Sequence, residues 1–351
     1  MIFLSHESAL AFWLAYRNGK PPTCNYLYRM PSEVGSSASL EAIEETLRRL
    51  AHDEASLRPI VGGNQPVHVL VDGRSHHSRS SGALIAHTIS RTLPSRSFYR
   101  VNPELAVASP ELCFIQTARS LDLVEAVRLG VELCSAYRTC GDCSACDSIT
   151  ALSAPVTDAH SIRSYVSRYY LDPSKRVAGA AAHIIPDGAA ASPMEVCLAL
   201  SLILPTKCGG YQLPPPLLNH TLALTSTAKY HTRRGSLICD LYWPERRLDV
   251  EYDSDQFHLT SKQHGLDSSR ADVLGRMNVN LISVTPWQFQ RAAEFDSVVK
   301  SIRAMLGLHV MKYSREQSSE RLQLRARLLS ATESSPITAI KQSYFEPRAT
   351  M

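Results

Sequence analysis

Five consecutive segments near the C-terminus constrain the fold more than any other part of the sequence. Residues 236–242 and 247–253 have strand-like composition and are joined by a hairpin turn. A helix over 264–277, a strand over 279–284 and a second helix over 286–306 are predicted to follow. The order β-β-α-β-α is typical of an α/β core. We therefore predict an α/β fold in which a mixed, mainly helical N-terminal region precedes this core.

The predicted hairpin brings three acidic residues together. Side chains alternate along a strand, so Glu251 and Asp253 share one face of the second strand. With the turn centred near Glu245 and Arg246, Asp240 on the first strand lies opposite Glu251. Opposed like charges destabilise a sheet unless protonation, an arginine or a divalent cation offsets the repulsion. Oxygen ligands of this kind favour Mg²⁺ or Mn²⁺, which activate water and stabilise the leaving oxygen of a phosphodiester.

The predicted helix after the hairpin places an arginine where an apolar residue is expected. Because of helical spacing, Arg270 lies on the inward stripe of this helix. A guanidinium there binds an anion, either the acidic cluster or a phosphate. Asp267, one turn earlier, pairs with Arg270 or orients His258. The inward stripe consists of Leu266, Arg270, Leu274 and Met277.

The whole set resembles the Vsr-like branch of the PD-(D/E)XK nuclease superfamily, and the match extends over residues 235–306. The resemblance implies that Asp240 is a metal ligand, and that Glu251 and Asp253 bind the metal or position water. It also implies that His258 is the general acid or base, within a restriction-endonuclease-like core. The matching residues are Asp240, Glu251, Asp253, Ser254, His258, Asp267, Arg270, Leu274 and Thr285.

Two features of the family pattern are missing from the sequence. The signature lysine of the superfamily would stand at Asp253. The glutamate that the family carries on a preceding helix has no assignable counterpart. The prediction is a Mg²⁺- or Mn²⁺-dependent DNA endonuclease, and the alternative is a catalytically inactive DNA-binding or antitoxin-like regulator with a degenerate nuclease fold.

The first two-thirds of the chain more weakly resembles the AbiEi-antitoxin-like region of actinobacterial proteins that carry a Vsr-like domain. The resemblance rests on residues 5–10, 108–113, 131–134 and 209–214. It implies an adaptor or DNA-binding role in phage defence or a toxin–antitoxin system, with a toxin or defence protein as partner; the alternative is a helical scaffold. The predicted divisions are a mixed α+β region over 1–150, a helical linker region over 151–225, the nuclease-like domain over 226–312, and a helical then flexible tail over 313–351.

A basic stretch directly precedes the first core strand. The net charge of +4 is too small to indicate a nucleic-acid partner by itself. DNA binding would have to be inferred from a local basic patch. Cationic side chains at this place would bind phosphate without sequence preference and hold DNA beside the metal. The alternative is a small solvated cluster. The patch consists of Lys229, His231, Arg233 and Arg234.

Four cysteines form the remaining candidate site. Cys140, Cys143 and Cys146 are each separated by two residues, and Cys134 is a further thiol upstream. Four thiolates bind Zn²⁺ or an iron–sulfur cluster, whereas the alternative is a Gly/Ser/Asp-rich loop that holds no metal.

The remaining sequence features favour a cytoplasmic protein. Nine cysteines, an odd number, in a chain too long to need disulfide bonds indicate reduced thiols. No secretory signal is recognisable at the N-terminus. The most apolar run, residues 196–205, is shorter than the roughly 20 residues that a membrane span requires, so we expect no membrane partner.

Overall fold

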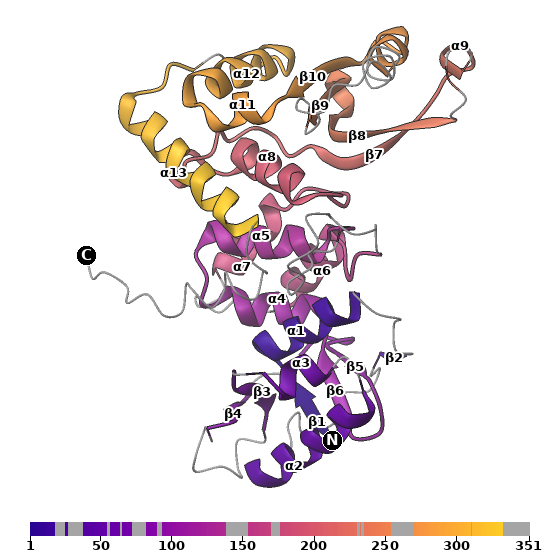
Figure 1. Ribbon diagram of the computed structural model, residues 1–351, viewed down its shortest axis with the longest axis vertical. Helices are drawn as coiled ribbons and strands as arrows, with labels where there is room; N and C mark the ends of the chain where they lie inside the picture. Colours follow the sequence, from indigo (N-terminus) through magenta and orange to yellow (C-terminus); the bar gives the residue numbers. More distant parts are fainter. Residues whose placement is uncertain are drawn as a thin grey trace.

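The chain forms a mixed α/β structure with one sheet near each end and a layer of helices between them (Figure 1). The computed structural model describes residues 1–17, 25–26, 38–54, 57–63, 65–71, 82–89, 93–137, 154–169, 176–229, 232, 235–253, 270–309 and 311–332.

Two short apolar strands lie at the centre of the N-terminal sheet. Strands β1 (Ile2–Leu4) and β6 (Leu105–Ala108) run parallel, and all their side chains are buried. Strands covered on both faces have continuous apolar runs rather than alternation, as here. The sheet order is β2-β5-β6-β1-β3-β4. Its other strands are β2 (Asn25–Tyr26), β3 (Val67–Leu70), β4 (Leu84–His87) and β5 (Phe98–Arg100), and its helices are α1 (His6–Arg17), α2 (Leu40–Asp53) and α3 (Arg58–Val61).

Side-chain caps begin the helices of the middle layer. Ser109, Asp122, Asp158 and Ser192 each accept a hydrogen bond from the backbone N–H three residues later. Each cap satisfies one of the donors that a helix start leaves free. Ser109 and Ser192 are each followed by a proline at the first helical position, a pair that is typical of a helix start. The helices are α4 (Pro110–Ala118), α5 (Leu123–Leu133), α6 (Ala159–Arg168), α7 (Arg176–Ile184) and α8 (Pro193–Ile203).

The C-terminal sheet has the order β10-β9-β8-β7, in which β10 runs parallel to β9 and the other neighbours are antiparallel. The predicted strands correspond to β8, β9 and β10, whereas β7 has no counterpart in the prediction. The predicted domain start at residue 226 therefore separates two paired strands, β7 and β8. The elements are β7 (Leu217–Ala223), α9 (Ser226–Lys229), β8 (Ser236–Trp243), η4 (Pro244–Arg246), β9 (Leu248–Tyr252), a helical stretch over 270–276 and β10 (Asn280–Val284).

The single helix predicted over 286–306 is wrong. The chain forms α11 (Pro286–Gln290) and α12 (Ala292–Met305), with Arg291 in an extended conformation between them. In one continuous helix, Phe289 and Phe295 would point about 120° apart. The break lets both rings enter the core, where they pack edge to face with centroids 5.0 Å apart. Neither Gly nor Pro marks this position, so tertiary packing decides it.

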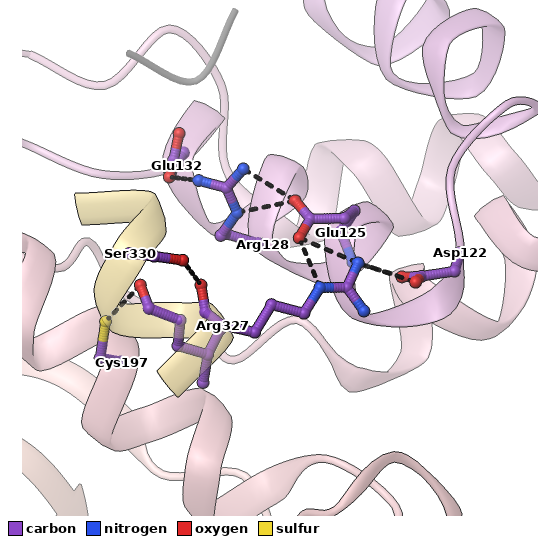
Figure 2. Close-up of polar contacts among 8 residues, drawn as sticks. Asp122, Glu125, Arg128, Glu132, Cys197, Arg327 and Ser330 are labelled. Atoms are coloured by element: carbon purple, nitrogen blue, oxygen red, sulfur yellow. Dashed lines mark hydrogen bonds and ion pairs between the residues drawn. The ribbon is translucent and has the colours of Figure 1, made fainter. Parts of the chain in front are cut away.

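The last described helix, α13 (Arg315–Thr332), ties the C-terminal part of the chain to the middle layer (Figure 2). Arg327 of α13 binds Asp122 at 2.7 Å and Glu125 at 3.0 Å. Glu125 also binds the buried Arg128 at 2.7 Å. The thiol of Cys197 in α8 donates to a backbone carbonyl of α13 at 3.4 Å. Every described helix, α13 included, is too short or too polar to cross a membrane.

Candidate functional site: a carboxylate cluster on the C-terminal sheet

Asp240 and Glu251 lie on adjacent strands at the positions that the hairpin turn predicts. The β8–β9 ladder pairs Leu241 with Val250 and Tyr242 with Asp249. The next pair in that register is Asp240 with Glu251. The backbone N–H of Tyr252 donates to Asp240 Oδ2 at 3.2 Å, which holds the Asp240 carboxylate beside β9.

The strands are distorted at Asp240. On a regular strand Cys239 and Leu241 share one face, yet Cys239 packs in the small apolar cluster with Leu274, while Leu241 packs in the main core. On β7, the residue opposite Asp240 is Asn219, whose φ is +46°. Non-glycine residues adopt this left-handed conformation at an energetic cost, and such residues concentrate at functional sites.

A third carboxylate, which the sequence analysis did not assign, comes from α8. Glu195 is buried, and its Oε2 accepts hydrogen bonds from the Asn219 side chain at 2.5 Å and from the Ala191 backbone at 2.7 Å. Glu195 is the third residue after the Ser192 cap, where a Ser-x-x-Glu capping box would explain it. Because a capping box would account for Glu195 locally, the sequence gives no sign of its tertiary position. Only the packing of α8 against β8 and β9 brings Glu195 to the cluster.

The surroundings of Asp240 raise its proton affinity. Burial raises the pKa of Asp240 to about 7, with further increases from the negative charges of Glu195 and Glu251. The Tyr252 N–H and the Arg270 guanidinium act in the opposite direction. A carboxyl with this pKa exchanges its proton near neutral pH and gains from any nearby cation.

Arg270 binds the acidic cluster, one of the two anions expected from its place on the inward stripe. Its Nε donates to both carboxylate oxygens of Glu251, at 2.8 and 3.1 Å, and its Nη2 also donates to Glu251. Nη2 makes a further hydrogen bond to the backbone carbonyl of Ile238. The guanidinium therefore bridges β8 and β9 at the level of the cluster.

Asp249, two residues before Glu251, is a fourth acid on the same face of β9, and it is fully buried. Neither of its carboxyl oxygens has a hydrogen-bond partner within the described residues, and Arg270 Nη2 lies 3.9 Å from Oδ2. Burial and the charge of Glu251 raise the pKa of Asp249. This carboxyl is therefore protonated at neutral pH, since a buried negative charge beside a second carboxylate is costly.

The predicted metal ligands are close but do not form a closed ligand set. Among the described residues, Asp240, Glu251 and Asp253 do not bring one oxygen each within 4.8 Å of the other two. Asp253 directly follows β9, where its N–H donates to the Val284 carbonyl at 3.0 Å. Side-chain rotation would be needed for these oxygens to share one ion.

Two further predicted site residues, Lys229 and Cys134, lie in the described part of the chain. Of the basic patch, Lys229 is exposed at the end of α9. Cys134 is buried at the C-cap of α5 and forms no disulfide bond. The residues that lie outside the described part of the chain are His231, Arg233, Arg234, His258, Asp267, Cys140, Cys143 and Cys146.

Comparison with protein-family profiles, with curated proteins and with solved structures finds no match to this chain.

Proposed function

We propose that this protein is a divalent-metal-dependent endonuclease that hydrolyses DNA phosphodiester bonds. The observation that carries the proposal is the position of Asp240 near Glu195 of α8 and Glu251 of β9, whose charges act on it, although the three do not bring one oxygen each within 4.8 Å of the other two. Burial and the other two charges together raise the pKa of Asp240 to about 7. A bound divalent cation would offset the repulsion among these carboxylates. The same cation could then act on a phosphodiester.

The donor chemistry of the cluster suits Mg²⁺ or Mn²⁺, because all the candidate ligands are carboxylate oxygens. Asp240 and Glu251 would hold the ion, with Asp253 beside them at the end of β9. When bound, the metal would supply an activated water and stabilise the leaving oxygen. Glu195 is the candidate for the glutamate that the Vsr-like resemblance places on a preceding helix.

Other side chains of the chain have supporting roles in this proposal. Arg270 holds Glu251 in position and is also proposed to contact a phosphate of the DNA. Lys229, His231, Arg233 and Arg234 are proposed to contact the DNA backbone. His258 remains the proposed general acid or base.

Plasmid cleavage by the purified full chain tests the proposal. Supercoiled DNA is incubated with Mg²⁺, with Mn²⁺ or with EDTA. We expect nicking or cutting with metal, and at least about 100-fold less cleavage by Asp240→Asn and by Glu195→Gln. Asn can still accept the hydrogen bond from the Tyr252 N–H, so Asp240→Asn tests charge rather than folding.

Glu245→Gln is the matched control, because this exposed acid lies in the turn of the same hairpin. It should cleave like the wild-type chain. Undiminished cleavage by Asp240→Asn, or cleavage that EDTA does not stop, contradicts the proposal.

A second candidate function is a non-catalytic DNA-binding or antitoxin-like regulator. The observation that favours it is the contact of Arg270 with both oxygens of Glu251, together with the missing family lysine at Asp253. A guanidinium in this position neutralises a carboxylate that a metal would otherwise use. Retarded but uncut DNA, with or without EDTA, supports this candidate against the first.

The proposed setting is cytoplasmic, in phage defence or beside a toxin or other defence protein. None of the five cysteines in the described part of the chain forms a disulfide bond, in keeping with a reducing compartment.

A further inference from the structure

A separate cluster of three histidines lies in the N-terminal sheet, remote in sequence from the carboxylates. His6 follows β1 as the first residue of α1, His68 is in β3, and His87 ends β4. One ring nitrogen of each lies within 4.8 Å of those of the other two, and all three side chains are partly buried. This is the one such set of possible metal-binding side chains within the described residues.

The distances within the cluster are close to those in a coordination sphere. His68 Nδ1 lies 2.9 Å from His87 Nε2 and 3.0 Å from Glu7 Oε2. Ligand atoms at 2.0–2.1 Å from a tetrahedral Zn²⁺ ion lie roughly 3.3 Å apart. The two distances from His68 Nδ1 are therefore within a few tenths of an ångström of that spacing.

His6 is held in a strained but well-supported position. Its φ is +49°, a left-handed conformation that is uncommon for residues other than glycine. Its N–H donates to Gln116 Oε1 at 3.1 Å, and the Cys113 thiol donates to its carbonyl at 3.4 Å. Its Nδ1 contacts Ser5 Oγ at 3.0 Å, so Nε2 is the nitrogen available for a metal. Metal-binding histidines are commonly oriented by such a contact at the other ring nitrogen.

Two of the three imidazoles, those of His6 and His87, have lowered proton affinity. Burial, together with the neighbouring histidines, lowers the pKa of His6 to about 3 and that of His87 to about 4. Both rings are therefore neutral at pH 7, and Glu7 adds one negative charge beside them. Neutral imidazole with a carboxylate is a donor set that suits Zn²⁺ and similar ions.

We propose that His6, His68 and His87 bind a divalent transition metal of the Zn²⁺ class, with Glu7 as the fourth ligand. The site connects the start of α1 to β3 and β4, so the metal stabilises the N-terminal sheet. It uses none of the residues of the carboxylate cluster and does not depend on the nuclease proposal.

Metal analysis of the full-length chain tests this site after any affinity tag has been removed. Protein produced in zinc-supplemented medium should contain about one tightly bound Zn²⁺ per chain at this site. Removal of the metal with a chelator should lower the Tm, and added Zn²⁺ should restore it. Co²⁺ in place of Zn²⁺ should give the visible absorption of tetrahedral nitrogen and oxygen coordination.

Single substitutions identify the ligands. We expect Zn²⁺ binding to be weakened more than about 100-fold, in a calorimetric titration, by each of His68→Gln, His87→Gln and Glu7→Gln. The loss of a direct ligand should reduce affinity more than the loss of a side chain that only orients a ligand. His160→Gln and His183→Gln, at exposed positions of α6 and α7, are the matched controls and should bind Zn²⁺ like the wild-type chain. Circular dichroism checks that each variant is folded.

A triple variant separates this site from the cysteine cluster. Replacement of Cys140, Cys143 and Cys146 by serine should leave the histidine-bound Zn²⁺, its Tm increase and the Co²⁺ spectrum in place. Full retention of Zn²⁺ affinity by both His68→Gln and His87→Gln overturns the proposal. A wild-type chain that neither contains Zn²⁺ nor changes its Tm when Zn²⁺ is added also overturns it.

Discussion

At the scale of single residues, the carboxylate cluster is defined by burial of acids that have few compensating charges. Arg270 binds Glu251 directly, whereas Asp240 accepts one backbone N–H and is influenced by Arg270 only through its charge. Its pKa of about 7 in the folded chain compares with an ordinary value of 3.8. The folded chain therefore binds this proton more tightly than the unfolded chain does, and this makes stability depend on pH.

The sign of that dependence gives a first residue-scale prediction, for metal-free protein in EDTA. The stability that Asp240 contributes is complete below pH 3.8 and is lost as the pH rises through about 7. Asp240→Asn has no carboxyl group to ionise, so the variant does not lose this stability as the pH rises. The variant should exceed the wild-type chain in unfolding free energy at pH 8 by on the order of 2 kcal/mol, because part-exposure leaves the carboxylate some solvation.

Urea unfolding of both proteins across the pH range measures this difference. It should shrink toward zero near pH 4, where Asp240 is protonated in the folded chain. A difference that stays constant from pH 4 to pH 8 would show that Asp240 does not titrate in this way.

At the scale of elements, a glycine pair supports α8 and hence the position of Glu195. The chain reverses at Gly209 and Gly210, and residues 211–213 then run back along the end of α8. The N–H groups of these three residues donate to carbonyls of the last turn of α8, at Ser201, Leu204 and Leu202. Such carbonyls have no partner within the helix itself, so the reversal satisfies them.

A methyl group at Gly210 should break this arrangement. A Cβ there would lie 2.0 Å from the Leu204 carbonyl oxygen, which is backbone and cannot rotate away. We expect Gly210→Ala to reduce the unfolding free energy by about 3 kcal/mol or more. Chemical denaturation measures the loss.

Gly275 provides the matched control for the same substitution. It lies in the helical stretch over 270–276, and a Cβ there meets nothing within 4 Å. Gly275→Ala should stabilise the chain by about 0.5–1 kcal/mol, because alanine loses less conformational freedom in a helix. Equal effects of the two substitutions would show that the reversal at Gly210 does not control stability.

At the scale of the whole molecule, one apolar core connects the two sheets. The main cluster of buried side chains includes Phe3 of β1, Leu198 of α8, Val250 of β9 and Leu328 of α13. Apolar contact is therefore continuous through the layers, which Figure 1 shows in the order N-terminal sheet, helices and C-terminal sheet. Parts that share a core in this way are expected to unfold together.

Two leucines of α13 test this expectation. Leu328 is 1% exposed, whereas Leu322 on the same helix is 47% exposed. Leu328→Ala should cost about 2–5 kcal/mol and lower the Tm in a single calorimetric transition, while Leu322→Ala should change stability by less than about 0.5 kcal/mol. A second, separate transition in Leu328→Ala would mean that the two ends of the molecule unfold independently.

Much of the fold could be predicted from residues that are close together in the sequence. Helix starts at Ser109 and Ser192 could be predicted because a capping residue and the proline after it are neighbours in the chain. The pairing of β8 with β9, and with it the opposition of Asp240 and Glu251, followed from the position of the turn. Strand β7 was missed, since its residues show no clean alternation and follow a proline run.

The sequence by itself therefore determined the hairpin, its acidic residues and the inward arginine, because each depends on residues a few positions apart. Only the tertiary structure decided that Glu195 joins Asp240, that α11 and α12 separate at Arg291, and that His6, His68 and His87 converge. These residues are far apart in the chain or are placed by core packing. Packing of buried surface fixes such neighbours, and the local sequence around each residue carries no signal for them.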